Sequence, residues 1–456
     1  METRKRPLSR REFLKRAGLV AGAVATSALL ESCAQPTPTK APPTSVTAPT
    51  PTSPPAVAKK VKLQWLEWIT PEISEEKMQE ILKAFYATDA GKNIEIERIS
   101  LPFAQVRDKI IATHLAGQIA DVLNMNSPWV VELAEQGILE PLNPYLESAG
   151  KDFTDSLVSG PMQPWKGQIH CIPLTSIPFL LFYNEKKLEE AGFSEPPKTW
   201  ADVESMGPKL TDPAKNTYCY ASGMAAQAPY NGVRIEIWPL IYQCNDNVVK
   251  DGKANMNSPA AAKALKFWVK LVNELKIYAP GVLTNLEKDK IEAFGAEQTA
   301  LLWSNVAHVT VLEQRNPALK FGLAPLPEGD TYGTGLTGWN SSIAKLSKNK
   351  EASWEFIRWL SSPEGNAILT MAAKHLPGNT KSDVSEMLKR DPRLNVPVEI
   401  LKRGRVLNPE AAMPEFTNLC RISIEQIHEV VNGRKSAEEA LEFANTEWDK
   451  ILQKYA

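Results

Sequence analysis

Between residues 61 and 137 the hydrophobic pattern changes period repeatedly, as it does where strands alternate with helices. The segment from Val61 is rich in strand formers and alternates. Thr70 followed by Pro71 is typical of a helix start, since Pro fits the first helical position. The expected strands are 61–68, 93–99 and 121–125, and the expected helices are 70–86, 105–115 and 128–136. This order predicts an α/β layer with a largely parallel sheet.

The second half of the chain repeats this style with longer helices. Ser258 followed by Pro259 opens a segment in which apolar residues recur at the spacing of one helix face, through Leu275. Thr199 and Asp202 match a capping box. The expected elements are a strand at 179–183 and helices at 185–191, from 199, at 258–275, from 362, at 421–431 and at 437–452.

The N-terminal segment 1–33 has the pattern of an export signal. A basic front containing Arg10 and Arg11 precedes an apolar run at 17–30, which is shorter than the roughly 20 residues that cross a bilayer. The paired arginines resemble a twin-arginine signal. The run ends in Leu-Glu-Ser-Cys, which resembles a lipobox and predicts lipidation of Cys33. The alternative is an N-terminal anchor that stays uncut.

Residues 34–58 are dominated by Pro, Thr, Ala and Ser. Such a segment has too little apolar surface to collapse and favours extended polyproline conformations. We therefore expect a disordered tether that holds a folded body away from a membrane, although the composition also fits a tail without a role.

Length and composition limit the number of domains and the kinds of partner that the rest of the chain can have. The body from residue 59 to 456 exceeds the roughly 250–300 residues at which single cores stop growing, so we expect two or three domains. A formal net charge of −1 argues against nucleic acid as a partner. The chain carries 12 Trp, a side chain suited both to cores and to stacking on flat ligand faces.

Four cysteines follow Cys33. Of these, Cys219 and Cys244 are the first candidates for a disulfide in an exported chain, and the alternative is that all four are buried thiols. The five histidines show no metal-ligand spacing, so we expect neither a metal nor a cofactor.

Several linked blocks resemble the family 1 extracellular solute-binding proteins, the maltose-binding type that serve ATP-driven (ABC) importers. Each block is weak alone, but their shared order and spacing from Val61 onward are specific. The blocks are AGQIADV at 116–122, LAEQGILEPL at 133–142, GQIHCIP at 167–173, PPKTW at 196–200, PLPEG at 325–329 and SKNKEASWEF at 347–356.

The resemblance implies an α/β, two-lobed periplasmic-binding-protein type II fold with a hinge and an interlobe cleft. It also implies a lipid-anchored monomer at the outer face of the cytoplasmic membrane, with an ABC permease as partner and without enzymatic activity. The implied lobes are 59–172 plus 333–366 and 176–330 plus 370–456, with crossings near 173–174, 326–332 and 367–371.

Ligands favour the carboxyl ends of sheet strands and clefts between domains. A pyranose presents an apolar face on which Trp can stack, and hydroxyls that Asn or Glu can bind. The implied solute is therefore a sugar or an oligosaccharide. The ligand-binding candidates are Glu67, Trp68, Asn126, Ser127, Trp129, Glu236, Trp238, Trp303, Ser304, Asn305, Trp339, Asn340 and Phe416.

Two alternatives stay open, and one motif match is set aside. Glu67 and Glu236 could form the carboxylate pair of an exported carbohydrate-active enzyme. The same receptor fold could instead take a non-sugar solute. Gly333, Gly335 and Gly338 match the dinucleotide pattern, but the following residues are strand-like, so we interpret them as part of a crossing between lobes.

Overall fold

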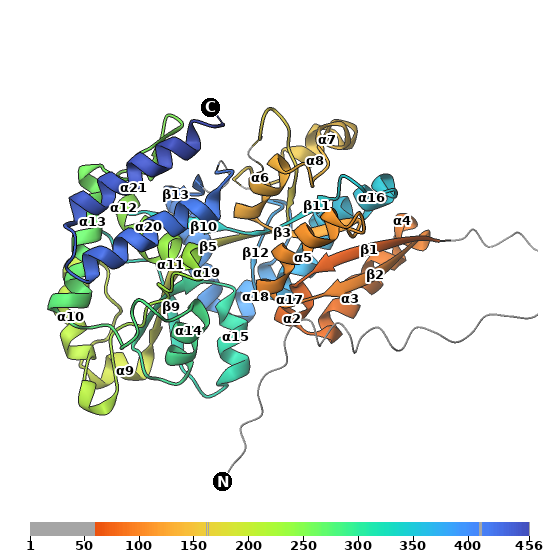
Figure 1. Ribbon diagram of the computed structural model, residues 1–456. Coiled ribbons are helices and arrows are strands. Elements are labelled where there is room, and N and C mark those ends of the chain that lie inside the picture. Colours follow the sequence, from red (N-terminus) through yellow and green to blue (C-terminus); the bar gives the residue numbers. More distant parts are fainter. Residues whose placement is uncertain (1–59, 161, 163, 410–412, 456) are drawn as a thin grey trace, which may run out of the picture. The chain divides into compact units, whose positions relative to one another are not determined.

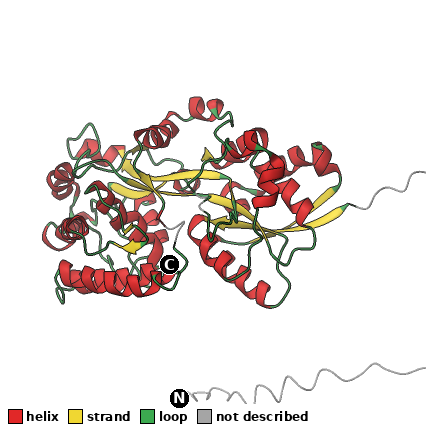
Figure 2. Cartoon of the chain, turned by 90° about the horizontal axis from the view of Figure 1, so that it is seen from above, coloured by secondary structure: helices red, strands yellow, loops and turns green. Residues whose placement is uncertain are grey.

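The computed structural model describes residues 60–160, 162, 164–409 and 413–455, and contains two main β-sheets flanked by helices (Figures 1 and 2). Both sheets belong to one compact unit of the chain. The predictions for Arg10, Arg11, Cys33 and the tether at 34–58 lie outside the described residues. We call the sheets, with the helices that cover them, the first and second lobes.

The first sheet has the strand order β2-β1-β3-β11-β4. Strand β1 runs parallel to β2 and β3, as the alternation of strand and helix predicts. Strand β11, which comes from much later in the chain, lies antiparallel to β3 and β4. The strands are β1 (Val61–Glu67), β2 (Ile94–Ser100), β3 (Val122–Asn126), β4 (Ile172–Pro173) and β11 (Trp339–Ile343).

Helices cover this sheet with their apolar faces. In α3, Met78, Ile81 and Phe85 are buried at helical spacing. The helix predicted at 70–86 is interrupted at Ser74, whose φ of 115° ends one helix and whose side chain caps the next. The helices are α2 (Ile69–Ile73), α3 (Glu75–Ala87), α4 (Asp89–Lys92), α5 (Phe103–Leu115), α6 (Ser127–Glu135), α7 (Asn143–Ala149), α8 (Lys151–Thr154), α16 (Lys350–Leu360) and α17 (Pro363–Ala373).

The second sheet is built around β5, which is longer than the predicted strand at 179–183 and is buried along nearly its whole length. Its order is β12-β5-β10-β13, and β8 and β9 also pair with β5. The strands are β5 (Thr175–Asn184), β8 (Leu301–Asn305), β9 (Phe321–Ala324), β10 (Thr334–Thr337), β12 (Leu376–Pro377) and β13 (Val406–Leu407), and a separate hairpin joins β6 (Val249–Lys250) to β7 (Lys253–Ala254).

The helices of the second lobe include two π-helical segments, η3 and η4, that the sequence pattern does not predict. Ser258 and Ser436 cap α13 and α21 where the sequence predicts helix starts. The helices are α9 (Glu185–Glu190), α10 (Trp200–Met206), η1 (Gly207–Leu210), η2 (Pro213–Lys215), α11 (Pro229–Gly232), η3 (Val233–Ile237), α12 (Trp238–Gln243), α13 (Pro259–Val269), η4 (Lys270–Glu274), α14 (Glu287–Gly295), α15 (His308–Arg315), α18 (Ser385–Arg390), η5 (Pro392–Leu394), α19 (Asn395–Arg403), α20 (Phe416–Val431) and α21 (Ala437–Leu452).

The chain passes between the sheets three times. Leu174 joins β4 to β5 at the predicted first crossing. The second crossing is Gly338, between β10 and β11, and the third runs through α17 to β12. A Cβ at Gly338 would lie 2.3 Å from the Thr175 carbonyl oxygen, so only glycine permits this close approach.

The position of β10 corrects the predicted lobe boundary. The resemblance places residues from 333 in the first lobe, but β10 pairs with β5 and β13 of the second sheet. The physical reason is close packing, because a side chain at Gly333 or Gly335 would overlap Tyr242 or Phe179. The glycines of the dinucleotide-like pattern therefore lie in or beside strands.

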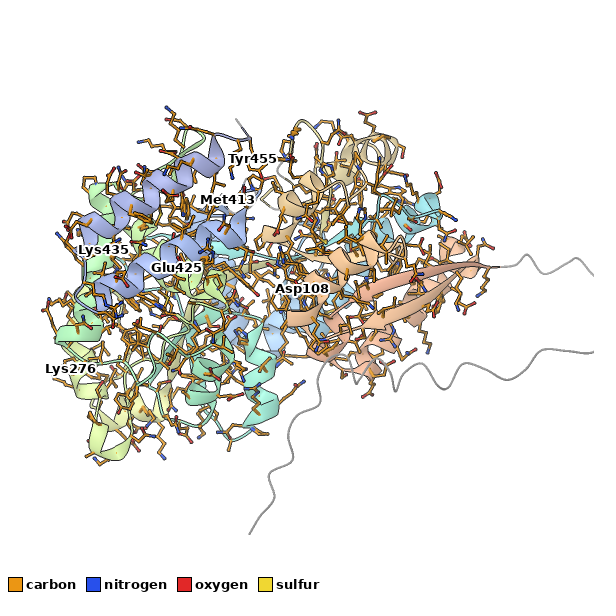
Figure 3. The ribbon with its side chains drawn as sticks, viewed as in Figure 1. Asp108, Lys276, Met413, Glu425, Lys435 and Tyr455 are labelled. Atoms are coloured by element: carbon orange, nitrogen blue, oxygen red, sulfur yellow. The ribbon has the colours of Figure 1, made fainter. Side chains whose placement is uncertain are left out.

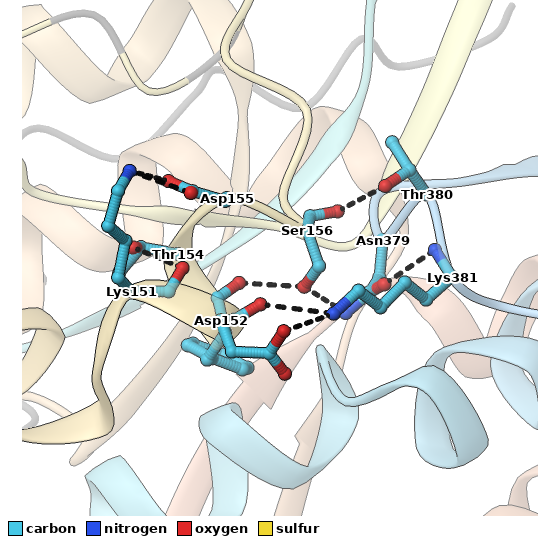
Figure 4. Close-up of polar contacts among 9 residues, drawn as sticks. Lys151, Asp152, Thr154, Asp155, Ser156, Asn379, Thr380 and Lys381 are labelled. Atoms are coloured by element: carbon cyan, nitrogen blue, oxygen red, sulfur yellow. Dashed lines mark hydrogen bonds and ion pairs between the residues drawn. The ribbon is translucent and has the colours of Figure 1, made fainter.

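Polar contacts hold the crossings together. Asn366 of α17 donates to the Leu174 carbonyl (2.8 Å) and accepts from the Asn379 backbone (3.0 Å). Asn379 also donates to Ser156 Oγ (3.0 Å), and Lys381 pairs with Asp152 (2.6 Å), as Figure 4 shows. The turn that follows β12 is thereby fixed to the first lobe.

None of the four described cysteines forms a disulfide, so the Cys219–Cys244 pairing is wrong. Cys219 is buried and Cys244 is half-buried, and burial raises the pKa of both thiols. Within the part of the chain that the structure describes, no helix is both long and apolar enough to cross a membrane.

Candidate functional site

A cavity of about 90 Å³ lies between the lobes, beside the crossings, and we call it the inner cavity. The first lobe contributes side chains from the ends of β1 and β3 and from the first turns of α2 and α5. The second lobe contributes side chains from β5 and β10 and from several helix N-termini. The lining residues are Trp68, Glu72, Phe103, Asn126, Ile177, Asn231, Arg234, Glu287, Asn305, Ala307, His308, Thr337 and Trp339.

Aromatic rings form the first-lobe wall. Phe103 stacks on Trp129 with ring centroids 5.0 Å apart, and Trp68 meets both rings edge-on at 5.3 and 5.4 Å. Trp129 therefore supports the two rings that line the cavity. Such a rigid aromatic wall can cover an apolar ligand face at little entropic cost.

The second-lobe wall is polar. Asn231 of α11 donates to the Glu287 carboxylate, and Arg234 of η3 donates to Thr337 Oγ1 (3.3 Å). The Arg234 guanidinium also lies 5.5 Å from the ring centroid of Phe179. His308 is bonded through Nδ1 to Ser304 Oγ (2.5 Å).

The crossing at Gly338 brings residues of both lobes together. Thr337 Oγ1 donates to Asn126 Oδ1 (3.4 Å), which links β10 to β3. The next strand begins with Trp339, whose ring meets His375 edge-on at 4.4 Å. Any change in the angle between the lobes therefore acts directly on the cavity wall.

Burial shifts the pKa of titratable side chains in and beside the inner cavity. Desolvation, followed by the nearby carboxylates of Glu287 and Glu67, raises the pKa of Glu72 to about 8. Burial lowers the pKa of His308, and it lowers the pKa of His375 to about 3, with His308 as a smaller cause. Both histidines are therefore neutral near pH 7.

A second hollow, which we call the outer groove, has a volume of about 580 Å³ and is also lined by both lobes. It adjoins the inner cavity along both walls, because Arg107 lies one turn after Phe103 in α5 and Pro229 lies two residues before Asn231. Tyr455, which is labelled in Figure 3, lines it near the C-terminus. Its charged groups are paired within the protein, as in Arg107–Glu132 and Lys454–Glu415.

Another hollow, of about 750 Å³, lies beside α17 and α18. An ion-pair network joins Lys374, Glu313, Asp391 and Arg393 across it. It has no aromatic lining, and it lies away from the strand ends that favour ligand sites. We therefore place the candidate site in the inner cavity.

The structure brings four of the predicted site residues to the inner cavity, namely Trp68, Asn126, Asn305 and Trp339. Each lies at the end of a strand or at a crossing, which is where the sequence argument places ligand contacts. Their roles in binding remain predictions.

Another group of predicted site residues lies directly behind this wall. Glu67 accepts two 2.8 Å bonds from Thr70 at the start of α2, and Asn340 donates to Ser127 Oγ (3.2 Å). These side chains hold cavity residues in place and do not line the cavity. The group comprises Glu67, Ser127, Trp129, Ser304 and Asn340.

The remaining predicted residues are in the second-lobe interior. Trp238 packs edge-on against Phe416 (5.9 Å), and Trp303 donates to the Tyr220 hydroxyl (3.1 Å). Glu236 is 2% exposed and pairs with Lys290 at 3.1 Å. We leave Glu236, Trp238, Trp303 and Phe416 out of the site, and Glu67 and Glu236 do not share a cavity as a hydrolytic pair would.

Several cavity residues are not predicted from the sequence, chiefly Glu72, Phe103, Asn231 and Glu287. Each lies on a helix near its start and not at a strand end. Only the position of a helix N-terminus after a strand could have indicated them, and that feature recurs throughout the chain.

The comparisons with known proteins concern the family and the fold of the chain. The model of the family described as bacterial extracellular solute-binding protein matches residues 70–367. A protein of Brucella abortus (strain 2308), named as a binding protein, is 22% identical over 380 residues, covering 82% of this chain and 90% of that protein. The maltotriose-binding protein of Pyrococcus abyssi is 25% identical and covers 61% of this chain and 58% of that protein.

Among solved structures, an ABC transporter solute-binding protein from Thermotoga lettingae, bound with α-D-tagatose, superimposes with a TM-score of 0.76 at 22% identity. The match covers 86% of this chain and all of that chain. This likeness establishes the two-lobed α/β fold of periplasmic solute-binding proteins.

Proposed function

Because the chain belongs to the family of bacterial extracellular solute-binding proteins, we propose that it captures a carbohydrate in the inner cavity and delivers it to an ABC importer. The observation that carries this proposal is the composition of the cavity, which joins aromatic rings to amide side chains. Trp68 and Trp339 offer faces or edges to a sugar ring, and Asn126 and Asn305 offer hydrogen bonds to hydroxyls.

Two comparisons support a carbohydrate in particular. The relative from Pyrococcus abyssi is named for maltotriose, and the Thermotoga lettingae structure holds tagatose. These two proteins are only 25% and 22% identical to this chain, so the cavity chemistry carries more weight than their ligands.

The size of the inner cavity implies movement. Ligand pockets commonly have volumes of roughly 300–1,000 Å³, whereas this cavity has about 90 Å³. A sugar can therefore enter only when the lobes separate. Contacts from both lobes exist only in the closed form, so a bound sugar shifts the population toward closure, and the importer then recognises the closed surface.

The N-terminal segment completes the proposal. Export by the Arg10-Arg11 signal, followed by lipidation of Cys33, would retain the receptor at the outer face of the membrane. The segment 34–58 would serve as its tether.

Calorimetry of the purified full chain with a panel of mono- and oligosaccharides tests the binding step. We expect one saccharide class to bind, and Asn305→Ala and Trp339→Phe to weaken it by about tenfold or more. Trp200→Ala is the matched control, since Trp200 stacks on Phe267 in the second lobe away from the cavity, with ring centroids 4.1 Å apart. Failure of every saccharide to bind, or cleavage of a bound glycan, would contradict the proposal.

A further inference from the structure

The inner cavity contains carboxylates from both lobes. Glu72 is carried by α2 of the first lobe, and Glu287 is the first residue of α14 in the second. The two side chains line the same cavity, so each closure of the lobes brings like charges together. A solute that fills the cavity must therefore supply positive charge or hydrogen-bond donors to the carboxylates of Glu72 and Glu287.

The cavity also holds more open acceptors than open donors. Asn231 Nδ2 donates to one oxygen of Glu287. Glu287 Oε1 and Asn231 Oδ1 are both buried and have no hydrogen-bond partner among the described residues. The bond to Glu287 fixes the amide orientation, because the flipped amide would set two oxygens against each other.

Arg234 and Thr337, which also line the cavity, use donors within the protein. Arg234 Nη1 donates to Thr337, and Thr337 donates in turn to Asn126. The His308 ring is bonded to Ser304 and is neutral near pH 7, so it adds no positive charge. The Arg234 guanidinium lies over the Phe179 and Tyr230 rings, at 5.5 and 5.9 Å.

Burying an unpaired acceptor costs free energy, and burying two carboxylates with only the Arg234 guanidinium beside them leaves a net negative charge that costs more. The raised pKa of Glu72 expresses the same conflict, since the one guanidinium of Arg234 does not balance two carboxylates in the cavity. An ammonium group would resolve the conflict, because it carries one positive charge and three donors.

We propose that the inner cavity selects a sugar bearing an ammonium group, held between Glu72 and Glu287 with Asn231 as a further acceptor. This inference rests on the proposed carbohydrate function and names the solute class within it. Charge-assisted hydrogen bonds are about twice as strong as neutral ones, so the amine should be preferred to a hydroxyl at the same ring position.

Calorimetry with matched sugar sets tests the proposal. Each set contains a parent sugar, its amino derivative and its N-acetylamino derivative, as in glucose, glucosamine and N-acetylglucosamine and in their β-1,4-linked disaccharides. At about pH 6, where the amine is charged, we expect the amino member of the preferred set to bind about tenfold or more tighter than the other two.

Variants of the full chain test whether Glu72 and Glu287 cause the preference for the amino sugar. Glu287→Gln and Glu72→Gln keep the side-chain shape, and each should remove most of the preference, measured within each variant as the ratio of its affinities for the amino sugar and for the parent sugar. The matched control is Glu292→Gln on the same helix, because Glu292 is exposed and pairs with Arg315. Thermal unfolding of each variant checks that it is folded.

The outcomes separate this inference from the proposed function. Equal or tighter binding of the parent sugar, or a preference that survives Glu287→Gln, would overturn the ammonium site and leave the carbohydrate receptor standing. Binding of putrescine without any sugar, or no binding of any set, would overturn both.

Discussion

At the scale of single residues, the second lobe depends on a buried ion pair. Lys290 and Glu236 are 1% and 2% exposed and lie 3.1 Å apart. Glu236 also accepts from Ser222 Oγ and from the Gly223 backbone, both at 2.9 Å. The pair joins α14 to η3, and these two elements carry Glu287 and Arg234 to the inner cavity.

We therefore predict that Lys290→Met lowers the free energy of unfolding by about 3–5 kcal/mol, because it leaves Glu236 buried without its cation. Urea unfolding of the full chain measures this. Lys288→Met on the same helix is the control, since Lys288 is 65% exposed and should change stability by no more than about 0.5 kcal/mol. Equal effects of the two substitutions would show that the buried pair is not needed.

The charge of Glu72 depends on the state of the lobes. The groups around it are Glu67 from β1, Arg98 from β2 beside Glu67, Glu287 from α14, Arg234 from η3 and His308 from α15. In the closed form the pKa of Glu72 is raised from 4.5 to about 8. When the lobes separate, Glu287 moves away and water returns, so the pKa falls toward its ordinary value.

Closure on a neutral sugar therefore takes up a proton. The affinity should be highest below about pH 4.5, should fall by up to tenfold per pH unit as the pH rises to about 8, and should be constant above that. Calorimetry of the wild type and of Glu72→Gln across this range tests the prediction. The variant should show a flat profile, and a flat wild-type profile would contradict it.

The residue scale also shows why the site is only partly predictable from sequence. Trp68 and Trp339 follow from the rule that strand ends face the cleft, and the structure places both at the cavity. Trp238 matches the same chemistry but packs against Phe416 and Trp448, which lie far away in sequence. Whether a Trp serves core or cavity is decided by partners that no local pattern reveals.

At the scale of elements, the crossings decide how the lobes move. Gly338 lies between β10 and β11, where the Trp339 backbone donates to Thr175 Oγ1 (2.8 Å) and Leu174 donates to the Trp339 carbonyl (2.8 Å). Two crossings thus lie side by side and are bonded to each other. A displacement here is transmitted to both walls of the inner cavity.

Gly338→Ala should disturb both stability and closure, because its Cβ would lie 2.3 Å from the Thr175 carbonyl oxygen. We expect a loss of about 1–3 kcal/mol in the free energy of unfolding and a weaker affinity for the solute. Gly295→Ala is the control, since its nearest neighbour, Leu312 Cδ2, is at an ordinary 3.5 Å. Wild-type stability and affinity in Gly338→Ala would show that the crossing tolerates a side chain.

Elements with strong local rules were well predicted. The helix at 437–452 is bounded as expected, and its capping box at Ser436 and Glu439 is formed. The π-helix η3 was not predicted, because its irregular turn leaves no period in so short a segment. Strand β10 was assigned to the wrong lobe, since its pairing partner β5 lies more than 150 residues earlier.

At the scale of the whole molecule, the described part of the chain forms two sheet-containing lobes joined by three crossings. The two-lobed α/β fold and the solute-binding family agree with the comparisons. The lobe boundaries follow from the sheets, whereas anchoring depends on residues outside the described part of the chain.

Anchoring is tested by fractionation of cells. Cys33→Ser should move the protein from the membrane fraction to the soluble extracytoplasmic fraction, because the lipid attachment site is lost. Arg10→Lys combined with Arg11→Lys should instead retain it inside the cell. Cys244→Ser, in the folded body, is the control, and membrane retention of Cys33→Ser would contradict lipid anchoring through this residue.

The most direct test of the central claim is the distance between the lobes with and without solute. Asp108 is an exposed side chain on α5, and Lys276 is exposed in the second lobe; both are labelled in Figure 3. Spin labels on Asp108→Cys and Lys276→Cys, in a Cys244→Ser background, report this distance by pulsed electron resonance. We expect a longer, broader distance distribution without the sugar, and a shorter, narrower one when the sugar saturates the protein. An identical distribution in the empty and the saturated protein would contradict it.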